Sequence, residues 1–166
     1  MKKRFKMFVA TMLVITCLAG CGTEKDIHWY ESTLDYFKEG FNNGWKNENS
    51  KFFISDELKD SSIKFGYALI DLDGDGIDEL LIGIMDGAEE TKFTNLIIKH
   101  RDFGPTQSFS TGEGYYMYLC DNNVIRMDSW YGSETRTEYM EYDSKNNSFP
   151  VIDGGSKPKK VELTGF

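Results

Sequence analysis

Histidine, cysteine and proline are scarce in this chain, and its basic side chains are outnumbered by acidic ones. The 166 residues include two histidines, three cysteines and three prolines, with 27 acidic residues against 19 basic residues. His28 and His100 stand in no zinc-ligand spacing and beside no partnered nucleophile. The sequence therefore gives no reason to expect zinc chemistry or histidine-dependent nucleophilic catalysis, and we interpret both histidines as surface or boundary residues.

The one marked apolar stretch near the start of the chain is too short to span a bilayer. Residues 7–18 are apolar except for Thr11 and Thr16, and residues 2–6 before them hold four basic side chains and no acidic one. A helix needs about 20 apolar residues to cross the roughly 30 Å hydrocarbon core. A cationic start followed by a shorter apolar stretch is typical of a secretory signal peptide, which predicts that residues 1–20 are removed on export.

The apolar stretch ends in Leu18-Ala19-Gly20-Cys21, which resembles the lipobox of bacterial lipoproteins. The resemblance implies cleavage between Gly20 and Cys21, and a diacylglyceryl thioether with palmitate-type chains on Cys21. Two acyl chains on one residue give a stable anchor. The expected location is therefore extracytoplasmic, on the outer face of the cell membrane. The alternatives are an ordinary signal peptide and a short anchor with a chance cysteine.

The charge of the exported part excludes nucleic acid as a partner. Residues 1–20 contain four basic residues and no acidic one, so the formal net charge of −8 becomes −12 without them. Nucleic acid repels a domain this acidic. The remaining 146 of the 166 residues suffice for one domain. With Cys21 lipidated, Cys120 has no intrachain partner, and we interpret it as a buried strand residue.

Residues 27–64 carry helical patterns, after a polar tether at residues 21–26. Gly40 and Gly44 weaken the far end of the first helix, and Ser55 is a plausible N-cap for a second, shorter helix. The apolar stripe of the first helix has spacings of three and four residues and consists of Ile27, Tyr30, Leu34, Phe37 and Phe41.

Residues 65–166 carry strand and turn patterns and are expected to form one domain with residues 27–64. A helix followed by a run of strands predicts an α+β, mainly β fold, with an amphipathic N-terminal helix packed on an antiparallel β-meander. After residue 153 we expect a loose segment with a short final strand. The predicted strands are Phe65–Ile70, Glu79–Met85, Thr94–His100, Tyr115–Leu119, Val124–Trp130, Thr135–Tyr142 and Phe149–Ile152.

The segment between the first two predicted strands has the composition of a calcium-binding loop. Acidic residues occupy alternate positions, and Gly74 and Gly76 permit the positive φ that tight winding needs. Calcium takes six to eight oxygen ligands, mainly from carboxylates and carbonyls. The predicted ligands are the side chains of Asp71, Asp73, Asp75 and Glu79 and the carbonyl of Ile77.

This loop differs from an EF-hand and is similar to the FG-GAP or VCBS repeat of integrin-like β-propellers. An EF-hand requires a bidentate glutamate at position twelve, where this chain has Ile82 in a predicted strand. The resemblance covers about twenty residues, from Phe65-Gly66 to Gly83, and Ile84-Met85 stands where the family has Ala-Pro. It implies a strand–loop–strand unit with structural Ca²⁺. Because a propeller needs about four or more blades and the motif occurs once, we expect no closed propeller.

Two other interpretations of the same residues remain open. Ile70-Asp71-Leu72-Asp73-Gly74 is also similar to the nucleophile motif of haloacid dehalogenase-type phosphatases. There Asp71 would be phosphorylated, with Asp73 as the general acid and magnesium beside both. That fold needs βαβ units, which the later strand patterns do not predict. The other interpretation is an acidic hairpin turn that binds no metal.

No catalytic constellation is recognisable, so we expect a non-enzymatic binding module of the envelope, with a protein or a glycan as its partner. The alternative is a small hydrolase, or an accessory subunit of one, that acts on cell-wall or surface polysaccharide. Glu89 with Glu90, or Glu138 with Glu141, would be its candidate carboxylates, although acidic residues are too common here for the pairing to be informative. A binding face would draw on the aromatic residues Tyr115, Tyr116, Tyr118, Trp130, Tyr131, Tyr139 and Tyr142.

Overall fold

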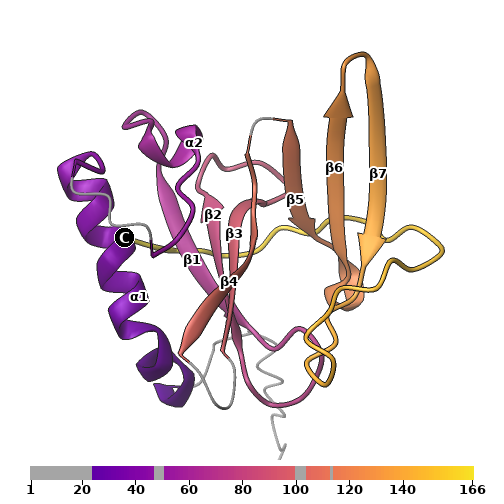
Figure 1. Cartoon of the computed structure of the whole chain (residues 1–166), viewed down its shortest axis with the longest axis horizontal. Helices are drawn as coiled ribbons and strands as arrows, with labels where there is room; N and C mark the ends of the chain where they lie inside the picture. Colours follow the sequence, from indigo (N-terminus) through magenta and orange to yellow (C-terminus); the bar gives the residue numbers. More distant parts are fainter. Residues whose placement is uncertain (1–23, 47–50, 100–103, 113) are drawn as a thin grey trace, which may run out of the picture.

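The computed structural model describes residues 24–46, 51–99, 104–112 and 114–166 (Figure 1). The predicted signal peptide, the lipobox with Cys21, and His100 lie outside these residues. No helix in the described ranges is both long enough and apolar enough to cross a membrane. The helices are α1 (Glu24–Asn43) and α2 (Asp56–Lys59), with a short 3₁₀ turn at Asp121–Asn123. The strands are β1 (Phe65–Ile70), β2 (Glu79–Ile84), β3 (Lys92–Lys99), β4 (Pro105–Ser110), β5 (Tyr115–Leu119), β6 (Ile125–Tyr131), β7 (Glu134–Met140) and β8 (Thr164–Gly165).

The strands form one open antiparallel sheet in the order β7-β6-β5-β3-β2-β1-β8. β4 lies off this path and pairs with β3, whose first residues also pair with β5. The strands of the described part close neither a barrel nor a propeller. The prediction of a mainly β fold without a closed propeller is confirmed, with one long helix beside the sheet (Figure 1).

Apart from shifts of one or two residues at strand ends, two segments differ from the predicted strands. β4 was not expected, because Pro105–Ser110 contains a single large apolar residue, Phe109. The predicted strand at Phe149–Ile152 is wrong: Val151 makes only an isolated bridge to Met140 and its side chain is 60% exposed. Phe149 packs instead edge-on against Phe109, with ring centroids 4.6 Å apart. Its apolar character therefore serves side-chain packing rather than strand pairing.

One hydrophobic core lies between α1 and the sheet. Tyr30 and Phe37 of α1 are fully buried there, together with Leu80 and Ile82 of β2. α1 begins at Glu24, three residues before the expected start, and ends at Asn43, where Gly44 takes a φ of 64°. A glycine with positive φ directly after the last helical residue is a common helix stop.

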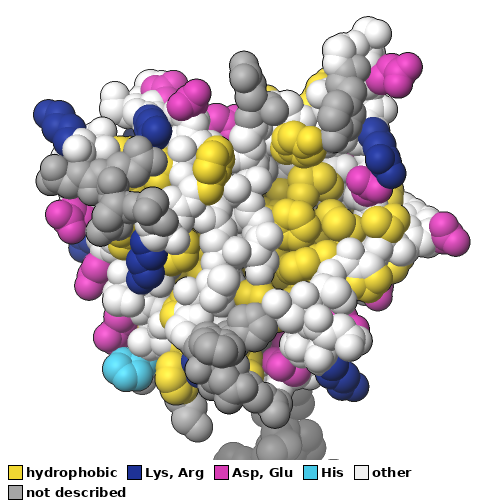
Figure 2. All heavy atoms as spheres, viewed as in Figure 1, with side chains coloured by type: hydrophobic (Ala, Val, Ile, Leu, Met, Phe, Trp, Pro, Cys, Tyr) yellow, Lys and Arg dark blue, Asp and Glu magenta, His cyan; other side chains and the backbone are white. Residues whose placement is uncertain are grey.

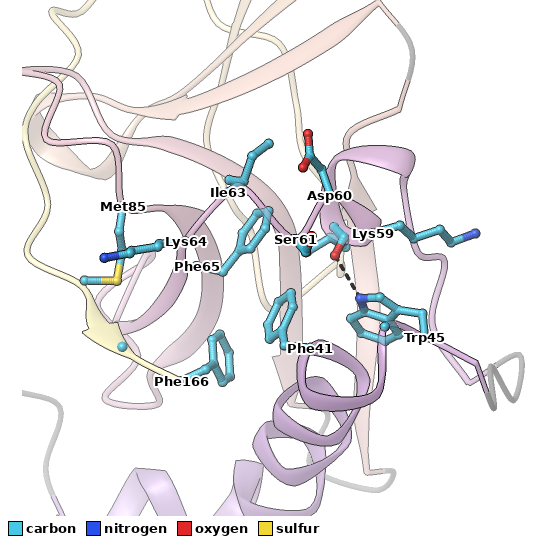
Figure 3. A pocket seen from close by; sticks show the side chains of 13 residues that line it. Phe41, Trp45, Lys59, Asp60, Ser61, Ile63, Lys64, Phe65, Met85 and Phe166 are labelled. Atoms are coloured by element: carbon cyan, nitrogen blue, oxygen red, sulfur yellow. Dashed lines mark hydrogen bonds between the residues drawn. The ribbon is translucent and has the colours of Figure 1, made fainter.

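An aromatic cluster closes this core at the end of α1 (Figure 3). The rings of Phe41 and Phe65 stack with centroids 5.0 Å apart, and Phe166 approaches Phe41 at the same distance. Trp45 donates its indole N–H to the carbonyl of Leu58 at 2.8 Å. Trp45 follows the end of α1 and Leu58 lies in α2, so this bond ties the two helices together. A cavity of about 400 Å³ opens beside these rings.

A second hydrophobic core lies on the opposite face of the sheet. It joins Leu81 and Leu96 of the central strands to Met117, Ile125 and Met140 of the β5–β7 meander. Figure 2 shows hydrophobic side chains gathered between β4 and β6. Cys120 is fully buried with a free thiol, as predicted, but it lies one residue beyond β5 and makes only an isolated bridge to Pro158 rather than belonging to a strand.

Candidate metal centre

The acidic loop connects two paired antiparallel strands, as predicted. Ile70 at the end of β1 pairs with Glu79 at the start of β2, so the loop spans residues 71–78. Gly74 and Gly76 have φ values of 76° and 82°, in the region that side chains disfavour. Leu72 is 6% exposed and belongs to the second core. It therefore anchors the loop to the sheet while the acidic residues remain near the surface.

Backbone N–H groups of the loop orient the Asp71 carboxylate. Its Oδ1 accepts hydrogen bonds from the N–H of Gly74 at 2.8 Å and of Asp75 at 3.1 Å, and its Oδ2 accepts one from Gly76 at 2.9 Å. The Asp71 carbonyl also accepts a bond from the Asn123 side-chain amide at 2.8 Å. Asp71 is therefore fixed by the loop it begins and by the turn before β6.

Asp73 and Asp75 are held in the same way. Asp75 Oδ1 accepts a hydrogen bond from the N–H of Ile77 at 2.9 Å, and Asp73 Oδ1 accepts one from the N–H of Asp75 at 3.3 Å. Asp73 Oδ2 accepts a bond from the backbone N–H of Ser144 at 2.9 Å, which ties the loop to the turn at Asp143–Ser148. A carboxylate oxygen has two lone pairs. Asp71 Oδ1 uses both in hydrogen bonds, whereas Asp71 Oδ2 and the oxygens of Asp73 and Asp75 keep acceptor capacity for a cation.

Asp71, Asp73 and Asp75 each contribute one carboxylate oxygen to a group in which all three oxygens lie within 4.8 Å of one another. This group could hold a metal ion. Two like charges about 4 Å apart repel by about 1 kcal/mol in water and about 4 kcal/mol near a protein surface. A bound divalent cation would turn that repulsion into attraction, so the donor set fits a hard cation that prefers oxygen.

The other two predicted ligands are placed differently. Glu79 is 2% exposed, and its Oε2 accepts a hydrogen bond from the N–H of Leu72 at 2.9 Å. Burial and the charges of the neighbouring aspartates raise the pKa of Glu79 to about 8, against the lowering effect of the Leu72 bond. Its side chain is not in the group of three aspartates, and participation of Glu79 and of the Ile77 carbonyl stays a prediction.

Three residues distant in sequence support the loop and were not found from the sequence. The Tyr30 hydroxyl donates to the carbonyl of Asp78 at 2.9 Å, which links α1 to the end of the loop. Asn123 and Ser144 supply the contacts to Asp71 and Asp73. Asn123 and Ser144 both lie between predicted strands, and nothing in their local pattern indicates a contact with the loop.

The remaining candidates form no second metal group in the described ranges. His28 is exposed, with its Nδ1 3.3 Å from Glu31. Glu138 pairs with Arg136 at 2.7 Å. The sheet is antiparallel throughout the described elements, so it contains no βαβ unit of the kind that the phosphatase interpretation requires. In the aromatic set, Tyr142 is buried, whereas Trp130 is 40% exposed.

No protein family, curated protein or solved structure matches this chain.

Proposed function

We propose that this chain is an exported lipoprotein, anchored through Cys21, in which the loop at residues 71–79 binds one structural Ca²⁺. The observation that carries the metal assignment is the group of three aspartates whose oxygens lie within 4.8 Å of one another. Calcium suits this set better than a transition metal, because all its donors are hard carboxylate oxygens without histidine or cysteine. The Ile77 carbonyl and Glu79 complete the proposed cage.

The proposed role of the ion is to join the loop to its surroundings. The β1–β2 loop contacts α1 through Tyr30, the turn before β6 through Asn123, and a later turn through Ser144. An ion that draws the aspartates together stabilises all these contacts at once. Extracellular calcium modules bind with a Kd of about 0.1–1 mM. We therefore propose that the site fills after export and that the folded domain acts as a non-enzymatic binding module at the envelope.

Calcium titration calorimetry tests this proposal. Asp75→Asn keeps an acceptor for the Ile77 N–H while it removes one charge from the group. We expect one site with a Kd of about 0.1–1 mM in the wild type, and at least about tenfold weaker binding in the variant, or about 1.4 kcal/mol.

Asp86→Asn is the matched control. Asp86 accepts a backbone N–H bond from Ala88 at 2.9 Å in an exposed turn outside the group, so the substitution makes the same chemical change away from the loop. It should leave calcium binding unchanged. Equal binding by the wild type and Asp75→Asn would refute the assignment.

The anchor is tested by metabolic labelling with palmitate in a bacterial host. The full chain should incorporate label and fractionate with membranes, and Cys21→Ala should do neither, because the thioether needs the Cys21 sulfur. Label that persists in the variant would contradict the proposed lipidation site.

A further inference from the structure

A cleft of about 580 Å³ lies between α2 and the connection from β4 to β5. This volume is within the range of small-ligand sites. Segment 53–59 forms one wall and Tyr116 of β5 belongs to the other, with Gly112 and Gly114 between them. A Cβ at Gly112 would meet only the Phe53 ring, at 3.9 Å, so the glycine leaves this part of the cleft open.

Phe53 presents an exposed ring from a fixed backbone. The residue is 57% exposed, although its ring is apolar. Its N–H donates to Gln107 Oε1 at 2.7 Å, and its carbonyl accepts a bond from Asn95 Nδ2 at 3.3 Å. Side chains of the sheet therefore satisfy both backbone groups of Phe53. A backbone that is fixed before binding loses little further conformational entropy when a ligand covers the side chain.

The polar groups of the cleft centre on Glu57. Glu57 Oε1 accepts a bond from Lys92 Nζ at 2.7 Å, and the same ammonium lies 3.2 Å from the centroid of the Tyr116 ring. Lys92 thus fixes the carboxylate relative to the aromatic wall. Glu57 Oε2 and the hydroxyl of Ser55, a residue that is 4% exposed, have no hydrogen-bond partner among the residues that the structure describes. A buried polar atom left unpaired costs about 1–3 kcal/mol.

The cleft and the acidic loop lie at opposite ends of the molecule. In Figure 1 the loop and the start of α1 are at the lower end, and α2 and the β4–β5 connection are at the upper end. The Tyr30–Asp78 bond fixes the first turns of α1 to the loop end. The 20 residues of α1 span about 30 Å. A chain anchored at Cys21 would therefore carry the cleft away from the membrane.

We propose that this cleft binds a sugar residue of an envelope glycan, an inference that rests on the proposed extracytoplasmic location. The apolar C–H face of the sugar ring packs on Phe53, and its hydroxyls donate to Glu57 and exchange hydrogen bonds with Ser55. A purely apolar ligand would leave both oxygens unpaired. Asp56 and Glu57 line the cleft together with Lys59, and Lys92 pairs with Glu57. Charges of both signs therefore offset one another and favour a neutral ligand over an ion. A neutral ring with several hydroxyl donors satisfies all these conditions.

Amide chemical-shift titration of the calcium-loaded full chain in detergent micelles tests the proposal. The probes are the trisaccharides of N-acetylglucosamine, glucose and mannose. We expect at least one to shift the amide signals of Ile54, Ser55 and Gly112. Loss of the ring in Phe53→Ala should weaken that binding about tenfold. Gly112→Leu should abolish it by filling the cleft.

Val151→Ala is the matched control, because it removes another exposed apolar side chain at a residue that does not line the cleft. It should leave the titration unchanged. The glycan proposal is overturned if no trisaccharide shifts these signals, or if Gly112→Leu binds as the wild type does. Calcium binding measured on the same sample keeps the two proposals separate: bound calcium without sugar binding overturns only the cleft assignment.

Discussion

Asp128 shows how a charged residue in a strand can be buried rather than solvent-facing. Its alternation with Ile125 and Met127 predicts a polar outer face for β6, yet Asp128 is only 6% exposed. Arg126 donates to its carboxylate from Nε at 3.0 Å and from Nη2 at 2.5 Å, and the Thr137 hydroxyl donates at 2.8 Å. Thr137 lies directly opposite in β7. Paired partners on the same face therefore compensate for the burial.

This network makes stability depend on pH in the acid range. Burial alone raises the pKa of the Asp128 carboxyl, but the bonds from Arg126 and Thr137 outweigh it and hold the pKa below its ordinary value. The stabilisation is then complete above the unfolded pKa of about 3.9 and is lost as the pH falls toward the folded pKa. We expect Asp128→Asn to lower the free energy of unfolding by about 2 kcal/mol at neutral pH. The difference from the wild type should shrink below about pH 4.

Urea unfolding of both proteins across this pH range measures the effect. Asp153→Asn, a change in an exposed loop, serves as the control and should follow the wild type at every pH. A difference between Asp128→Asn and the wild type that stays constant down to about pH 2 would contradict the assigned role.

At the scale of elements, Gly40 has a packing role that its helix propensity conceals. The sequence suggests a residue that weakens the end of α1, but the helix continues past it to Asn43. A Cβ at Gly40 would lie 2.5 Å from ring atoms of Trp45. That ring is 6% exposed and held by its bond to Leu58. Gly40 therefore admits the indole that joins the end of α1 to α2.

Gly40→Ala consequently tests whether the cost of crowding Trp45 exceeds the gain in helix propensity. Alanine gains about 1 kcal/mol over glycine in a helix, whereas overpacking a core costs about 1–3 kcal/mol. We expect a net loss of stability and altered Trp45 fluorescence, measured by urea unfolding. Ser32→Ala, at an exposed position of the same helix, should be neutral or slightly stabilising. If Gly40→Ala proved more stable than the wild type, the packing explanation would be wrong.

The elements that the sequence predicts well are those with strong apolar patterns. β1 and β5 have the predicted bounds, and β2 differs only in ending one residue early. These strands were predictable because each presents large apolar side chains to a core. β4 is mostly polar and is held by pairing with β3, a non-local contact that its own residues do not indicate. At Phe149 the sequence predicts a strand that does not form, because this apolar side chain packs against aromatic rings instead.

The candidate metal centre also combines residues that a local sequence pattern predicts with residues that it does not. Alternating aspartates and glycines are a local pattern, and the structure brings Asp71, Asp73 and Asp75 together. The supports from Tyr30 and Ser144 lie 48 and 71 residues away from their loop partners. Contacts of such separation depend on the whole fold, so no local pattern could predict them.

For the whole molecule, the acidic loop is a junction rather than a peripheral turn. It connects the helix side of the sheet, through Tyr30, with the side of the later strands, through Asn123 and Ser144. Without a cation the three aspartates repel one another and oppose these contacts. Calcium should therefore stabilise the folded state of the entire domain by mass action.

Thermal unfolding of residues 22–166 in EDTA and in about 2 mM calcium tests this claim most directly, since extracellular modules have a Kd of about 0.1–1 mM. Such a site adds about 0.6–1.8 kcal/mol of stability, which raises the Tm by about 2–5 °C. We predict that rise for the wild type and for Asp86→Asn, and its loss in Asp75→Asn. An equal Tm with and without calcium would show that the loop binds no structural calcium.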